Sequence, residues 1–150
     1  MWVARTFTTL VVLAILLITA LTVRRDRMYR RHLMDLLEVC VNRLNEQLAV
    51  NPYLPVAWPL DNLPDRIRSD FAQRFEYAQD AIRDFARVRN APTIIAWSHV
   101  LPIVLGADGR AVAVYENGRV RAAWMTEAEF DRHMAEQEEA LRRAIRDIGS

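Results

Sequence analysis

The chain has 150 residues, with 20 basic and 19 acidic side chains, and its formal net charge is +1. A balance so close to neutrality does not suggest a nucleic-acid-binding surface, which requires clustered excess positive charge. All basic residues are arginine, and the absence of lysine excludes a Walker-type phosphate loop and Schiff-base catalysis, because both need the amine.

Residues 6–23, TFTTLVVLAILLITALTV, form an uncharged and mostly apolar segment of 18 residues. As an α-helix rising ~1.5 Å per residue, this segment is ~27 Å long, close to the ~30 Å thickness of the hydrocarbon layer. A cleaved signal peptide is the alternative, but the small-residue site around Ala20 and Thr22 is poor and dense positive charge follows it. We therefore predict a retained, single-pass transmembrane anchor over residues 1–23.

Arginines flank the apolar segment 6–23 unequally, with one before it and five after it between residues 24 and 31. The positive-inside rule therefore predicts an N-out, C-in orientation in a cell inner membrane, with the domain in the cytoplasm; a periplasmic domain is the alternative. The same side chains would attract anionic lipids. The residues predicted to lie at the membrane and lipid interface are Trp2, Arg5, Arg24, Arg25, Arg27, Arg30 and Arg31.

Small residues within the anchor would permit close approach of helices from other integral-membrane subunits. A scatter of small lipid-facing residues explains the same pattern and stays an open alternative. The residues predicted to pack against partner helices are Thr8, Thr9, Ala14, Thr19 and Ala20.

Helical spacing continues past the anchor and predicts a juxtamembrane helix over residues 24–50. We expect its apolar stripe to pack against the protein's own domain, because the stripe is shorter than the three or four heptads typical of a homodimeric coiled coil. Cys40 is the only cysteine, so it cannot form an internal disulfide, and its place on the stripe predicts a small core residue. The stripe comprises Leu33, Leu37, Cys40, Leu44 and Leu48.

Residues 51–63 form a proline-rich segment, with prolines at 52, 55 and 59. Proline lacks a backbone donor and fixes φ, so we expect a surface loop rather than a helix or a central strand. This loop carries Tyr53, Leu54 and Trp58. Two interpretations stay open: these side chains form a contact for a partner, or Trp58 folds back over the core.

Residues 64–150 are predicted to form a small α+β domain, in which helices pack on a meander of three or four antiparallel strands. The first helix would begin at Pro64 and end near Asn90, before Pro92. Its buried face would comprise apolar residues that recur at helical spacing, namely Ile67, Phe71, Phe75, Ala78, Ile82 and Phe85.

The apolar residues alternate after residue 92, which predicts strands, including residues 93–100 and 102–105. Asn117-Gly118 predicts a two-residue type I′ hairpin turn that places Glu116 opposite Arg119. We expect a half-buried sheet. One face would receive Ala111, Ala113, Tyr115, Val120, Ala122 and Trp124, and the other Val112, Val114, Arg121 and Ala123.

Thr126-Glu127-Ala128-Glu129 is a capping box, which predicts the start of a final helix. Gly149 would end this helix. The inner stripe of the helix would comprise Phe130, Met134, Leu141, Ile145 and Ile148.

No pattern in the sequence predicts a catalytic, cofactor or metal site. His32, His99 and His133 fall on three different predicted elements, whereas a metal site requires convergent ligands. No serine lies in a nucleophile elbow, and Cys40 has no histidine partner in a readable motif. We therefore expect a protein that is not an enzyme and that holds no cofactor.

Residues 101–145, LPIVLGADGRAVAVYENGRVRAAWMTEAEFDRHMAEQEEALRRAI, combine an apolar strand, an Asp-x-Gly turn at Asp108-Gly109, a second strand and a helix rich in Glu, Gln and Arg. This order resembles the membrane-proximal input domain of bacterial sensor histidine kinases, in which an anchor and a juxtamembrane helix precede the strands. The resemblance implies a sensor-like domain separated from its output, because this sequence carries no kinase module and no second span. It also implies an extracytoplasmic domain, against the orientation that the arginines predict.

These features lead to two functional hypotheses. The first is a non-catalytic accessory subunit of a larger integral-membrane complex, for example a respiratory or photosynthetic one, which binds lipids and other subunits through its transmembrane helix and its α+β domain. The alternative is a sensory or signalling input domain, which binds a small ligand on the meander and couples it to the juxtamembrane helix.

Overall fold

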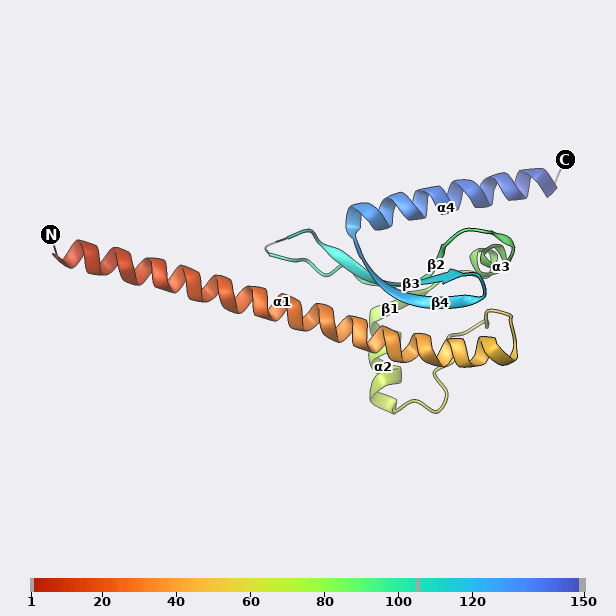
Figure 1. Cartoon of the computed structure of the whole chain (residues 1–150), viewed down its shortest axis with the longest axis horizontal. Helices are drawn as coiled ribbons and strands as arrows, with labels where there is room; N and C mark the ends of the chain where they lie inside the picture. The colour runs from red at the N-terminus through yellow and green to blue at the C-terminus, as the bar shows by residue number, and fades with distance from the viewer. Residues whose placement is uncertain (1, 105, 149–150) are drawn as a thin grey trace.

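The computed structural model describes the backbone of residues 2–104 and 106–148, and the side chains of residues 7–104 and 106–147. It confirms an α+β fold, in which a long apolar N-terminal helix precedes a small domain with a four-stranded antiparallel sheet (Figure 1). The elements are α1 (Trp2–Val50), α2 (Asp65–Arg74), β1 (Phe75–Tyr77), α3 (Asp80–Val88), β2 (Thr93–Ser98), β3 (Gly109–Glu116), β4 (Arg119–Thr126) and α4 (Glu127–Ile148).

Helix α1 runs without a break through both the predicted anchor and the predicted juxtamembrane helix. Its N-terminal part extends away from the domain, and its C-terminal part lies along one face of the sheet (Figure 1). The predicted stripe is buried there: Leu37, Cys40 and Leu44 are each 0% exposed. The expectation that the stripe packs against the protein's own domain is therefore confirmed.

The sheet has the strand order β1-β2-β3-β4, so that each strand pairs with its neighbour in sequence. The face that carries Ala111, Ala113 and Tyr115 packs against α1, as the alternation predicts. The opposite face is not open to solvent, because Phe130 of α4 packs against Val112 and Val114. The prediction of a half-buried sheet is thus wrong for the central strand β3, which helices cover on both sides (Figure 1).

The β3–β4 hairpin follows the prediction. Glu116 pairs with Arg119 across the strands, and the turn residues Asn117 and Gly118 have φ angles of 51° and 80°. Positive φ at both central positions is the requirement of a type I′ turn, which Asn and Gly meet at least cost.

The predicted single helix from Pro64 to Asn90 is wrong, because a strand interrupts it. After α2 the chain becomes extended at Phe75 (φ −121°, ψ 140°), and β1 pairs with the end of β2 before α3 begins. The ring of Phe75 stacks on that of Phe71 at 4.8 Å, so both side chains stay buried although the helix has ended. Tertiary pairing has overridden the helical periodicity.

The fourth strand is therefore β1 and not residues 102–105. Among the described residues just before and within this segment, Leu101 forms an isolated β-bridge with Gly109. We define the whole connection between the two strands, residues 99–108, as the β2–β3 loop. Leu105, the predicted end of that strand, lies outside the described residues.

Trp58 folds back onto the core, which is the second of the two interpretations that the sequence left open and argues against a partner contact at this residue. Its side chain is 8% exposed, and its indole Nε1 donates a hydrogen bond to the carbonyl oxygen of Cys40 at 3.0 Å. Leu54 is half-buried against the same core. Tyr53 is 54% exposed, with the guanidinium of Arg87 3.9 Å from its ring centroid, so of the three residues it alone keeps a largely exposed side chain.

Helix α4 begins with the predicted capping box, in which Glu129 accepts from the Thr126 backbone N–H at 2.9 Å and the Thr126 hydroxyl accepts from the Glu129 N–H at 3.3 Å. Its inner stripe is shorter than predicted. Phe130 is buried and Met134 packs against the same cluster, but Ile145 is 59% exposed. The side chain of Ile148 and the whole of Gly149 lie outside the described residues.

Two side-chain amides join the helices to backbone groups of the sheet. Asn45 of α1 accepts from the Val120 N–H and donates to the Val120 carbonyl oxygen, each at 2.8 Å. Gln137 of α4 does the same at Ile94, with distances of 2.8 and 3.1 Å. Ile94 lies at a register irregularity of β2, and Val120 lies in the edge strand β4. Both amides therefore satisfy strand groups that no neighbouring strand reaches.

We expect Asn45→Ala to lower the free energy of unfolding by about 1–3 kcal/mol, because it leaves a donor and an acceptor of Val120 unpaired against α1. Urea denaturation of the full chain in detergent micelles measures the change. Asn42→Ala is the matched control, since Asn42 is an exposed asparagine of the same helix, and its effect should be close to zero. Equal stability of the two variants would contradict a stabilising role of the hydrogen bonds between Asn45 and Val120.

A bidentate ion pair connects the start of β3 to the first turn of α4. The Arg110 Nε and Nη2 atoms donate to the two carboxylate oxygens of Glu127 at 2.7 and 2.6 Å, and the guanidinium lies over the ring of Phe130. The hydrogen bond from Arg110 lowers the pKa of the Glu127 carboxyl below its ordinary value.

This pKa shift predicts a pH dependence of stability. Because the pKa of Glu127 is lower in the folded state, the pair contributes fully above the ordinary carboxyl pKa and loses its contribution as the pH falls through the lowered value. Glu127→Gln should therefore cost on the order of 1 kcal/mol near pH 7 and progressively less toward pH 3. Denaturation midpoints across this range test it. Glu138→Gln, at an exposed pair, is the control and should follow the wild type at every pH.

Candidate membrane interface

The N-terminal part of α1 presents an apolar surface that nothing in the described chain covers. Among the described residues, one helix is long and apolar enough to cross a membrane, with a mean hydropathy of 2.2 over its best 18-residue window, of which 0% is buried. Leu10, Leu17 and Ile18 are each more than 60% exposed. Exposed apolar surface of this extent is unfavourable in water, and it is compatible with a single-pass membrane anchor.

The small residues of the anchor lie on this exposed part of α1. Thr8, Thr9, Ala14, Thr19 and Ala20 are all exposed, and the packing of partner helices against them stays a prediction. Trp2 and Arg5 belong to α1, but their side chains lie outside the described residues.

The five arginines that follow the anchor, which we call the arginine cluster, are all exposed. Two of them have a partner: Arg25 Nη2 lies 3.3 Å from Asp26 Oδ1, and the guanidinium of Arg30 lies 4.7 Å from the ring centroid of Trp124. No hydrogen bond or ion pair joins the other three to the described side chains. The cluster comprises Arg24, Arg25, Arg27, Arg30 and Arg31.

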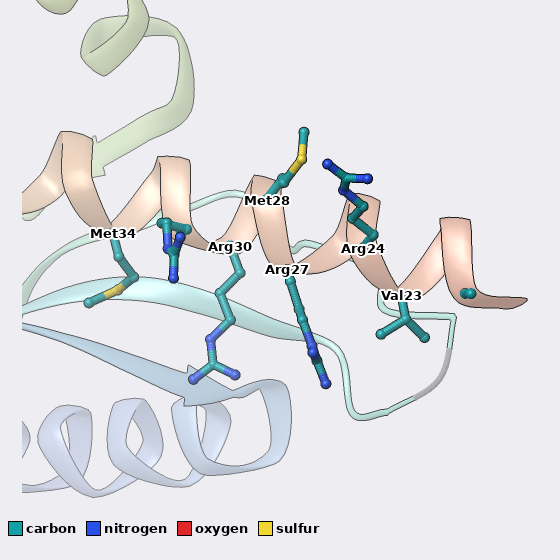
Figure 2. A pocket seen from close by; sticks show the side chains of 8 residues that line it. Val23, Arg24, Arg27, Met28, Arg30 and Met34 are labelled. Atoms are coloured by element: carbon teal, nitrogen blue, oxygen red, sulfur yellow. The ribbon is translucent and has the colours of Figure 1, made fainter.

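Two adjoining hollows, which we call the interfacial cleft, lie beside the arginine cluster. The larger, of about 760 Å³, follows α1 and is lined by Ala20 and Met28 as well as by arginines. The smaller, of about 420 Å³, lies between α1, the β2–β3 loop and β4. Val23, Arg27 and Arg30 line both hollows. In Figure 2 Arg27 and Arg30 project to the same side of α1 as Val23, whereas Arg24 and Met28 point away from them.

Trp124, which lines the smaller hollow of the cleft, is placed by a close approach of β4 to Gly109. A Cβ at this position would meet the Met125 carbonyl oxygen at 2.6 Å and the Trp124 indole at 2.7 Å, so only glycine fits. Trp124 can therefore lie close to Gly109 at the start of β3 and present its face to Arg30.

Asp26 fastens the β2–β3 loop to α1. Its side chain is buried, and its Oδ2 accepts a hydrogen bond from the Val104 backbone N–H at 3.1 Å, while Oδ1 faces Arg25. The loop consequently reaches back along α1 toward the N-terminal end of the chain (Figure 1). Sequence reasoning missed this role. The sequence signal for this role was that Asp26 is the one acidic residue among the arginines of residues 24–31. Helical periodicity alone does not identify such a residue.

Other ionisable groups lie apart from the cleft. Among the described residues no group of three or more His, Cys, Asp or Glu side chains could hold a metal ion. His99 and Glu76 approach to 3.9 Å, but both side chains are more than half exposed. Burial raises the pKa of the Cys40 thiol to about 12, so it is protonated at neutral pH, as expected of a core cysteine.

No protein-family model, no curated protein and no solved structure matches the chain. The resemblance of residues 101–145 to a sensor input domain therefore stays a prediction from the sequence.

Proposed function

We propose that the chain is a non-catalytic, single-pass accessory subunit of a larger integral-membrane assembly. One observation carries this proposal: the helix that presents the exposed apolar segment is the same unbroken helix whose stripe forms the domain core. A separate anchor joined by a flexible linker would only tether the domain, whereas this arrangement fixes its height and orientation above the membrane.

The dimensions of α1 support a bracing role. Its 49 residues, at ~1.5 Å each, span roughly 74 Å, of which the apolar segment 6–23 accounts for ~27 Å. From Leu33 onward the helix is stiffened by packing on β3 and β4 and by the hydrogen bonds of Asn45. A partner subunit that binds the anchor through its small residues would meet the domain at a defined distance from the bilayer.

The interfacial cleft supports a binding function more than a catalytic one. Its polar side chains are mainly arginines, and the one carboxylate that lines it among the described residues, Asp26, is already engaged by Arg25 and by a backbone N–H. General acid–base catalysis needs a group poised to exchange a proton, and neither arginine nor a paired carboxylate supplies one. We infer that the cleft contacts lipids or another subunit.

A ligand-sensing domain is the second candidate, and the position of the cleft favours it. A small ligand between α1, the β2–β3 loop and β4 would touch the helix that leads into the membrane. Such a protein would purify alone or as a homodimer and would gain thermal stability with its ligand.

The accessory-subunit proposal predicts co-purification in fixed stoichiometry. After membranes are washed with carbonate and solubilised in a mild detergent, the tagged chain should bring down the same membrane proteins in constant ratio, as measured by quantitative mass spectrometry. A Met28→Gly, Tyr29→Gly variant introduces a flexible joint at two exposed positions and should stay in the membrane but recover less partner. Recovery of the wild-type chain without partners, or its release by carbonate, would contradict the proposal.

We propose further that the membrane is a cell inner membrane and that the domain faces the cytoplasm, because the arginine cluster follows the anchor. Val56 is 80% exposed in the proline-rich loop, so Val56→Cys should react with a membrane-impermeant maleimide in inside-out vesicles and not in intact cells. The wild-type chain is the control, since its buried Cys40 should stay unlabelled. Labelling of the variant in intact cells would place the domain on the opposite side.

A further inference from the structure

We propose that the β2–β3 loop is a second membrane contact, which inserts Ile103 and Val104 into the interfacial layer of the bilayer beside α1. This inference rests on the proposed function only in taking the anchor to lie in lipid. It adds a bilayer-binding surface on the folded domain, in a segment where sequence analysis predicted a strand.

The β2–β3 loop lies at the level of α1 where the apolar segment ends. The Val104 N–H donates to Asp26, which lies three residues beyond Val23, the last residue of the apolar segment. Three residues correspond to ~4.5 Å along the helix axis. The smaller hollow of the cleft is lined by Val23 together with Ile103, Gly106 and Ala107, so the loop and the end of the apolar segment border the same space. Figure 2 shows the loop passing beside Val23.

The residues of the loop suit an apolar environment. From Leu101 to Ala107 the sequence carries no charged residue, and the side chain of Val104 is 62% exposed. Exposure alone decides nothing, because Val56 and Val88 are each 80% exposed elsewhere on the domain. Val104 differs from them in its place, since it lies where the headgroup and acyl boundary meets α1, at a depth that interfacial apolar side chains occupy.

Contacts within the protein already hold Ile103 and Val104 in place beside α1. Asp26 fixes Val104, the Asp108 carboxylate accepts from the Ile103 N–H at 2.8 Å, and Leu101 bridges Gly109. These contacts reduce the conformational entropy that the loop would lose on contact with lipid. The backbone N–H groups of Ile103 and Val104 are both paired, which lowers the cost of moving these two groups out of water.

The charges around the loop favour an anionic lipid surface. Arg27 and Arg30 line the hollow beside it, and Arg24 lies one turn nearer the span. The only carboxylate that lines the cleft among the described residues, Asp26, is offset by Arg25. Cations at this level are attracted to anionic headgroups, while the apolar tip enters the layer beneath them.

Site-directed spin labelling tests the proposal on the full chain in vesicles of phosphatidylcholine and phosphatidylglycerol. A nitroxide on Val104→Cys should collide several-fold more with oxygen, relative to a water-soluble nickel chelate, than one on Val88→Cys, which reports the water-exposed side of the domain. A nitroxide on Leu13→Cys, in the middle of the anchor, gives the lipid reference. Buried Cys40 should contribute no label.

Two further variants separate insertion from mere proximity. Asp26→Ala removes the acceptor that fixes Val104, so the label at residue 104 should shift toward the water profile while the label at residue 13 stays unchanged. Asp26→Asn keeps an acceptor and should preserve the lipid profile. If the label at residue 104 matches that at residue 88 while residue 13 reports lipid, the loop contact is overturned and the anchor stands. If residue 13 itself reports water, the proposed function fails.

Discussion

The continuity of α1 is the constraint on which the structure depends. Leu37 and Leu44, which are fully buried, belong to the same unbroken helix as Leu17 and Ile18, which are exposed on the apolar segment. The helical hydrogen bonds between these two regions leave no hinge, so the sheet cannot rotate about the anchor without breaking the helix. The arginine cluster, the interfacial cleft and the β2–β3 loop therefore keep a fixed relation to the apolar segment.

The domain is attached to its long helices through backbone groups as well as through side-chain packing. Asn45 binds the edge strand, Gln137 binds β2 at its irregularity, and Asp26 binds the β2–β3 loop. Each of these side chains comes from a helix and meets a backbone N–H that the sheet leaves unpaired. Apolar burial by itself tolerates sliding between surfaces, whereas these directed bonds fix the register of helix on sheet.

The parts of the fold that local sequence patterns determine were predicted, and the parts that depend on distant contacts were not. The stripe around Leu37, the Asn117-Gly118 turn and the capping box at Thr126 follow from spacing and turn chemistry within a few residues. The strand at Phe75 could not be read locally, because its helical spacing is overridden by pairing with β2. Likewise the arginine cluster could be predicted from the charge asymmetry of the sequence. The hydrogen bond of Asp26 to Val104, 78 residues away, could not.

The same continuity has a consequence for biosynthesis. Asn45 and its stripe leave the ribosome 75 residues before Val120, the strand residue that they meet in the finished fold. At a synthesis rate of about 5–20 residues per second, the stripe waits roughly 4–15 s without its sheet. During that interval the leucine-rich stripe is exposed next to a newly inserted transmembrane span. The bilayer or a chaperone would be available to bind it. Once β3 and β4 have formed, the stripe would leave the bilayer or the chaperone and become buried against the sheet, which would complete the folding of the domain.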